Sequence, residues 1–109
     1  MTLTALQDLF TSASDETWHL HPFGGGWVAN TATVASTAYI GPDATVGDYA
    51  TVRDHAAVYG HAIVYGHAMV SGRAKVGGHA MIGGRAMVGG QSMVGGQSMI
   101  EWAETWMDD

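Results

Sequence analysis

Residues 61–72, which read HAIVYGHAMVSG, contain the pattern that decides the fold of this protein. An alanine, a β-branched aliphatic residue and a glycine stand at alternate positions, and the same triplet returns six residues later. Val64 and Val70 mark the register of the two copies. Residues two apart lie on the same side of a β-strand, so the alanine and the aliphatic residue of each copy face one way together.

The period of six continues through most of the 109 residues. A β-branched residue marks every sixth position: Val28, Val34, Ile40, Val46, Val52, Val58, Val64, Val70, Val76, Ile82, Val88, Val94 and Ile100. A small residue precedes each mark by two: Gly26, Ala32, Ala38, Ala44, Ala50, Ala56, Ala62, Ala68, Ala74, Ala80, Ala86, Ser92 and Ser98. In the later repeats a glycine follows the mark by two: Gly60, Gly66, Gly72, Gly78, Gly84, Gly90 and Gly96. Apolar helix faces recur near every 3.6 residues, so this period predicts strands.

Three short strands of this kind close a triangular coil of about 18 residues, and successive coils stack at about 4.8 Å, the ordinary spacing of paired strands. The aliphatic side chains fill the triangle, the alanines lie where the corner leaves little room, and glycine lets the backbone turn. Residues 26–100 therefore predict an all-β solenoid of about four coils.

This pattern resembles the hexapeptide-repeat family of left-handed parallel β-helices, whose motif is matched by segments such as 44–48 (ATVGD) and 86–90 (AMVGG). The resemblance covers residues 26–100 and supplies the left hand, since the general crossover rule alone favours a right hand. It also implies a trimer of parallel prisms.

The ends of a solenoid expose unpaired strand edges, so we expect a cap at each end. Residues 1–25 predict an N-terminal cap and connector, with an amphipathic helix over 2–11. Residues 101–109 predict a second short helical cap, with Trp102 and Trp106 four residues apart on one side.

The residue before each mark points outward, and positions 18 apart stack into three faces. Five of the seven methionines occupy this position, and an exposed apolar row of this kind indicates an interface. The predicted interface residues are Trp27, Ile63, Met69, Met81, Met87, Met93 and Met99. Trp18, Trp102 and Trp106 are alternative contacts for which burial against the end coils is favoured.

The residue three after each mark lies at a corner, where stacking predicts polar ridges along the prism. These ridges carry His55, His61, His67, Arg73, His79 and Arg85, which we interpret as solvated residues. The remaining metal candidates are His61 and His79, one coil apart. Asp43 lies a further coil away, too far to complete a small-ion site, so no metal and no cofactor is expected.

Composition excludes several classes of protein. Ten acidic residues against four basic ones give a net charge of -6, which disfavours direct binding to a nucleic-acid backbone. The absence of cysteine excludes disulfides and thiolate chemistry. No apolar run reaches membrane-spanning length, and the start of the chain lacks the order of a secretory signal, so a cytoplasmic location is expected.

These features together favour a non-catalytic, oligomeric β-solenoid that binds itself and another protein or serves a structural role. The stretches 21–29 and 37–42 also resemble short hexapeptide-repeat proteins of phages and mobile elements, which implies an inhibitor of a host defence factor. The alternative is an enzyme, because the family includes acyltransferases and zinc-dependent carbonic anhydrases. An acyltransferase of this family usually has a loop that interrupts the coils, and residues 26–100 contain no interruption of the repeat.

Overall fold

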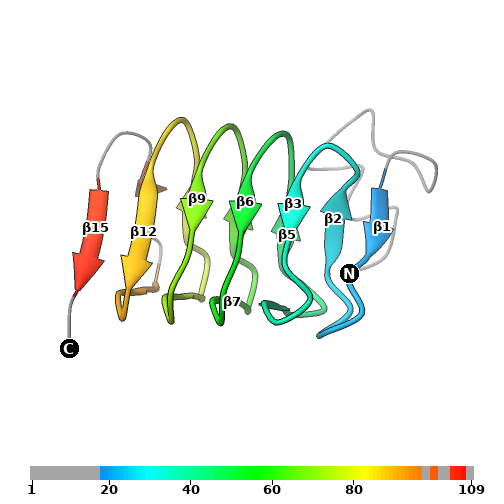
Figure 1. Ribbon diagram of the computed structural model, residues 1–109, viewed down its shortest axis with the longest axis horizontal. Helices are drawn as coiled ribbons and strands as arrows, with labels where there is room; N and C mark the ends of the chain where they lie inside the picture. Colours follow the sequence, from blue (N-terminus) through cyan, green and yellow to red (C-terminus); the bar gives the residue numbers. More distant parts are fainter. Residues whose placement is uncertain (1–17, 97–98, 101–103, 108–109) are drawn as a thin grey trace.

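The computed structural model describes residues 18–96, 99–100 and 104–107. Short parallel strands form three sheets that make the three sides of a prism (Figure 1). Sheet A contains β2 (Trp27–Ala29), β5 (Thr45–Val46), β8 (Ile63–Val64), β11 (Met81–Ile82) and β14 (Met99–Ile100). Sheet B contains β3 (Thr33–Val34), β6 (Thr51–Val52), β9 (Met69–Val70), β12 (Met87–Gly90) and β15 (Glu104–Met107). Sheet C contains β4 (Tyr39–Ile40), β7 (Ala57–Val58), β10 (Lys75–Val76) and β13 (Met93–Val94).

The chain visits sheets A, B and C in turn, so every three strands complete one coil, and the coils wind with a left hand (Figure 1). From β2 to β11 each strand pairs in parallel with the strand one coil further on, and the paired residues are 18 apart. Val46, for example, pairs with Val28 on one side and Val64 on the other. The predicted left-handed β-solenoid of about four coils is confirmed.

The interior holds the two residue series that the repeat predicts. The aliphatic marks from Ile40 to Val88 and the alanines from Ala38 to Ala86 are at most 1% exposed. Val34, on the first strand of sheet B, and Ala32, just before that strand, are only partly buried. Ser92 replaces the interior alanine in the fourth coil, and within the described residues its buried hydroxyl has no hydrogen-bond partner.

From the second coil onward the corners turn through a left-handed backbone conformation two residues after the mark, whereas Asn30, Ser36 and Pro42 of the first coil do not have positive φ. All seven predicted glycines from Gly60 to Gly96 have φ between 61° and 66°. Asp48 and Asp54 occupy the same position in an earlier coil, with φ of 54° and 61°. Aspartate is among the few residues with a Cβ atom that tolerate this conformation, so the turn keeps its shape where glycine is absent.

A strand closes the N-terminal end of sheet A. The segment β1 (Trp18–Leu20) pairs antiparallel with β2, and Trp18 is buried as favoured above. The loop that follows donates the backbone N–H of Gly26 to Ile40 and accepts the N–H of Ile40 at Phe23, both across the first coil. The helix predicted over residues 2–11 lies outside the described residues.

The prediction of a C-terminal helix over residues 101–109 is wrong for its central part. Glu104–Met107 form β15, which pairs in parallel with β12. Residues 104–107 form backbone hydrogen bonds by pairing with the open edge of β12. An isolated helix of nine residues, by contrast, has only marginal stability in water. Thr105 pairs with Val88, 17 residues earlier, so the last coil is one residue short. No helix suited to crossing a membrane occurs in the described part of the chain.

Candidate functional site

The outward side chains of sheets A and B form two apolar rows in the later coils, one on each face, and the exposed corner residues His67 and Arg85 lie between the two faces. Met81 pairs with Ile63 and Met99 along sheet A, and Met87 pairs with Met69 along sheet B. Met99 is 61% exposed, and the other four are partly exposed. The methionines therefore form two columns, Met81 and Met99 on sheet A and Met69 and Met87 on sheet B. The two members of each column lie in adjacent coils.

Two of the predicted contact residues, Trp27 and Met93, do not belong to these methionine columns. Trp27 is only 9% exposed, so its side chain offers little surface to a partner in this conformation. Met93 lies on sheet C, beside Lys75, and is 71% exposed. Trp102 lies outside the described residues, and for Trp106 the structure describes the backbone alone, as part of β15.

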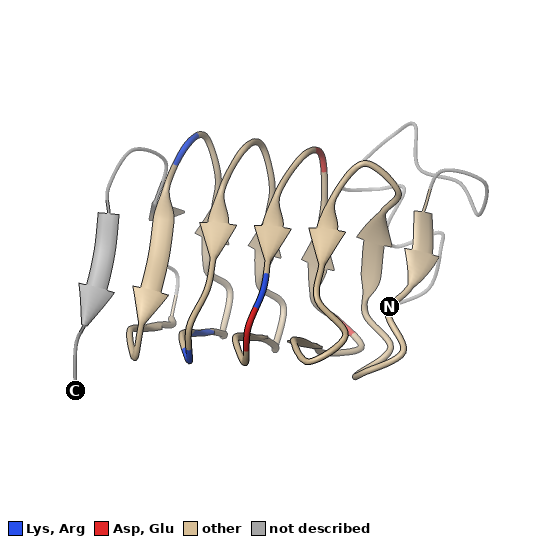
Figure 2. Ribbon diagram, viewed as in Figure 1, with Lys and Arg blue, Asp and Glu red and all other residues tan. Residues whose placement is uncertain are grey.

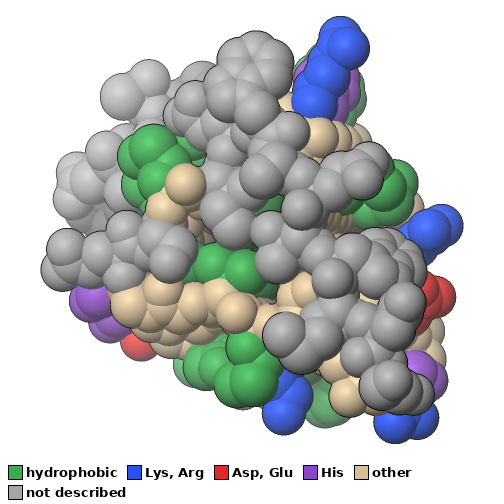
Figure 3. Space-filling view, turned by 90° about the vertical axis from the view of Figure 1, so that its left-hand side faces the viewer, with side chains coloured by type: hydrophobic (Ala, Val, Ile, Leu, Met, Phe, Trp, Pro, Cys, Tyr) green, Lys and Arg blue, Asp and Glu red, His purple; other side chains and the backbone are tan. Residues whose placement is uncertain are grey.

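The polar ridges stack as the 18-residue period predicts. The rings of Tyr49 and His67 are parallel within 9°, with centroids 5.4 Å apart, and those of His61 and His79 are parallel within 7°, with centroids 5.0 Å apart. In the end-on view of Figure 3, His side chains project at the rim of the prism, with hydrophobic side chains between them. Tyr49, His61, His67 and His79 are all exposed, so both stacks lie at the surface of the prism.

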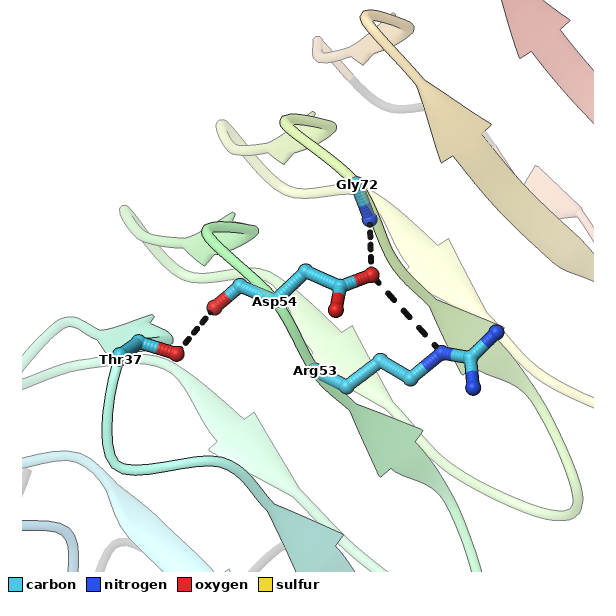
Figure 4. Close-up of polar contacts among 4 residues, drawn as sticks. All are labelled: Thr37, Arg53, Asp54 and Gly72. Atoms are coloured by element: carbon cyan, nitrogen blue, oxygen red, sulfur yellow. Dashed lines mark hydrogen bonds and ion pairs between the residues drawn. The ribbon is translucent and has the colours of Figure 1, made fainter.

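A second kind of ladder joins three coils at one corner (Figure 4). The hydroxyl of Thr37 donates to the backbone carbonyl of Asp54 at 2.5 Å, and the carboxylate of Asp54 accepts the N–H of Gly72 at 3.0 Å. Nε of Arg53 lies 3.9 Å from the same carboxylate oxygen. Thr31, Asp48 and Gly66 repeat the hydrogen bonds at the next corner. These aspartates therefore have a structural role, because they satisfy a backbone N–H of the following coil.

This geometry predicts an order of stability for two variants at Asp54. Asp54→Ala removes the acceptor and leaves a side chain in a left-handed conformation, so we expect the free energy of unfolding to fall by about 1–2 kcal/mol. Asp54→Gly removes the same acceptor and relieves the strain, so its loss is expected to be smaller. Urea unfolding followed by circular dichroism measures both variants, and an Asp54→Gly protein less stable than Asp54→Ala would contradict the assignment.

Two tyrosines cover glycines of the next coil, which sequence reasoning missed. A Cβ atom built on Gly77 would lie 2.3 Å from the ring of Tyr59, and one built on Gly83 would lie 2.2 Å from the ring of Tyr65. The rings therefore lie flat against the backbone at these two corners. The sequence contains a signal for this contact, because each tyrosine precedes its glycine by 18 residues, the length of one coil.

Charges divide along the prism (Figure 2). Residues 55–100 carry Arg73, Lys75 and Arg85 and no acidic residue, whereas six of the ten acids precede this segment and four follow it. Arg73 and Lys75, together with Gln91 and Met93, line a shallow depression of about 220 Å³ between the third and fourth coils. This depression contains no histidine to act as a general base.

The structure places the candidate metal pair side by side without a third ligand of the usual kind. His61 and His79 stack face to face, and the part of the chain that the structure describes contains no group of three or more His, Cys, Asp or Glu residues able to hold a metal ion. A zinc site built from nitrogen and oxygen ligands alone is thus not formed among these residues.

Comparison with known proteins gives no further guide, because no family model, curated protein or solved structure matches this chain.

Proposed function

We propose that this protein is a non-catalytic binding module of the hexapeptide-repeat type, and that its methionine columns on sheets A and B form the surface through which copies of the chain associate. The observation that carries the proposal is the pairing of Met81 with Met99 and of Met69 with Met87 at partly or fully exposed outward positions of two adjacent faces. Exposed apolar rows of this kind are characteristic of protein interfaces, and methionine adapts its shape to a partner.

Rigidity supports this proposal. The outward side chains lie on strands that are paired with their neighbours along each sheet, which fixes their spacing, so the surface needs little ordering when a partner binds. The resemblance of the repeat implies a trimer, and the phage-type resemblance implies that the assembled prism engages a host protein. The enzyme alternative has less support, since between residues 18 and 96 the described coils are not interrupted by a long loop.

A charged residue in the methionine column tests the proposal. We expect the wild-type chain to be an oligomer in native mass spectrometry and Met81→Glu to be a monomer at the same concentration, because a buried unpaired carboxylate opposes association. The far-ultraviolet circular dichroism of the variant should be unchanged, since the Met81 side chain points away from the core.

Ala57→Glu is the matched control. It adds one negative charge at the outward position of sheet C, where its neighbour one coil on is Lys75. The control should keep the mass of the wild-type assembly. A monomeric wild-type protein, or a Met81→Glu variant of unchanged oligomeric mass, would show that these columns are not the contact between copies.

A further inference from the structure

The sequence His-Ala-Met occurs twice, at residues 67–69 and 79–81, and both copies lie at the same place in the repeat. The central alanines, Ala68 and Ala80, point into the core and are at most 1% exposed. Met69 is the first residue of β9 and Met81 is the first residue of β11, and each histidine lies in the turn that precedes the strand. Both histidines are exposed and both methionines are partly exposed, and the Cα atoms of each His–Met pair are at most about 7 Å apart.

Each copy has a second methionine directly beside it in the next coil. Met87 pairs with Met69 on sheet B, and Met99 pairs with Met81 on sheet A. Paired strands lie about 4.8 Å apart, and a methionine side chain has three rotatable bonds, so both thioether sulfurs of a pair can reach one point near the histidine. The fold thus brings together one imidazole and two thioethers at two places.

Ring stacking orients both histidines. His67 stacks on Tyr49 and His79 stacks on His61, and both are exposed. The lone pair of an imidazole nitrogen lies in the plane of the ring, so an ion can bind at the ring edge without breaking the stack. The histidines are thus held for coordination before any ion binds, which reduces the ordering cost of binding.

We propose that these two ligand sets bind soft monovalent metal ions, with Cu(I) as the cellular ion. The first site consists of His79, Met81 and Met99, and the second of His67, Met69 and Met87. Thioether sulfur is a soft ligand that selects Cu(I), and imidazole also suits copper. The second site has Arg85 two residues before Met87, so repulsion between cations makes the first site the tighter one.

The chain supplies its own comparison at Met93. This methionine also follows a small interior residue, but Gln91 stands in the place of the histidine and Lys75 in the place of the paired methionine. A cationic neighbour and the loss of both other ligands leave Met93 without a site. Met93→Leu therefore serves as the control for substitutions at Met69 and Met81.

The inference does not depend on self-association, because all three ligands of each site come from one chain. The leucine variants separate the two ideas, since leucine keeps the apolar surface and removes only the sulfur. Exchange of methionine for leucine conserves volume and is well tolerated, so circular dichroism should show folded protein for each variant.

The experiment titrates the intact protein with Cu(I) under reducing, oxygen-free conditions against a coloured Cu(I) chelator, and native mass spectrometry counts the ions bound per chain. We expect two ions per chain for the wild type and for Met93→Leu, one for Met81→Leu, one for Met69→Leu and none for the double variant. His79→Gln should weaken the first site at least about tenfold, and Zn(II) should not compete.

Each deviation has a defined meaning. Wild-type protein that fails to compete with the chelator would overturn the proposal, as would a double variant that still holds two ions. Loss of an ion from Met93→Leu would show that exposed methionines bind copper without the histidine. Ag(I), which has similar ligand preferences and no redox chemistry here, should reproduce the stoichiometry and so exclude oxidation of the methionines as its cause.

Discussion

Gly78→Ala is expected to lower the free energy of unfolding by about 2–3 kcal/mol, which is large for the addition of one methyl group. Gly78 has φ of 64°, a conformation that costs an alanine about 1–2 kcal/mol. The added Cβ atom would also lie 2.7 Å from the backbone nitrogen and 2.8 Å from the backbone oxygen of Gly96 in the next coil. Neither contact involves a flexible side chain, so the two coils must move apart.

Two neighbouring glycines separate these causes. Gly96 has φ of 65°, but a Cβ atom there meets nothing within 4 Å, so Gly96→Ala should show only the conformational cost. A Cβ atom on Gly95 also meets nothing, and its φ is outside the left-handed region, so Gly95→Ala should be close to neutral. The urea midpoint of unfolding should be highest for Gly95→Ala, lower for Gly96→Ala and lowest for Gly78→Ala. A Gly78→Ala protein as stable as Gly96→Ala would mean that coil contact at this corner adds nothing.

The coils could be predicted from the sequence because equivalent positions in successive coils must meet the same requirement for an inward or an outward side chain. Val64 is interior for the same reason as Val46 and Ile82, so one correct assignment of its side fixes the others. The glycines add independent support, because a left-handed corner favours glycine, and glycine occupies this position at every corner from residue 60 to residue 96. The outward positions of the methionines follow directly from this alternation.

The ends could not be predicted in this way because the period stops there. Whether residues 104–107 form a helix or a strand depends on the open edge of β12, which exists only after the coils have formed. The local sequence favoured a helix, but pairing with β12 makes this segment a strand. At the other end, the ring of His21 donates from Nε2 to the carbonyl of Ala38 at 2.8 Å, across 17 residues, a contact that no motif announces.

The methionine columns of the candidate site could be predicted from the sequence, but the grouping of histidines with methionines could not. Alternation places Met81 and Met99 on one face, and the 18-residue coil makes them neighbours. The burial of Trp27 was not predictable from the repeat, which assigns it the same outward direction as Met81. The stacking of His79 on His61 depends on ring orientation, which spacing does not specify.

Ile82→Ala is expected to lower the free energy of unfolding by about 3 kcal/mol, the usual cost of emptying a fully buried aliphatic position. Ile82 is completely buried, and it and Ile40 are the largest of the fully buried side chains that the structure describes. Its neighbours along sheet A are Val64 and Ile100, whose backbones are fixed by pairing on β11. Because the coils are hydrogen-bonded at a set spacing, they cannot collapse to fill the space.

Ile82→Val is the control, with an expected loss of about 1 kcal/mol, because valine already fills the equivalent position in the two preceding coils of sheet A. In a solenoid each coil contacts only its neighbours, so the damage should remain local. Hydrogen exchange should therefore accelerate most at the N–H of Tyr65, which donates to the carbonyl of Ile82, and least at the N–H of Thr33, which donates across the first two coils. Uniform acceleration at both amides would show instead that all four coils unfold as one cooperative unit.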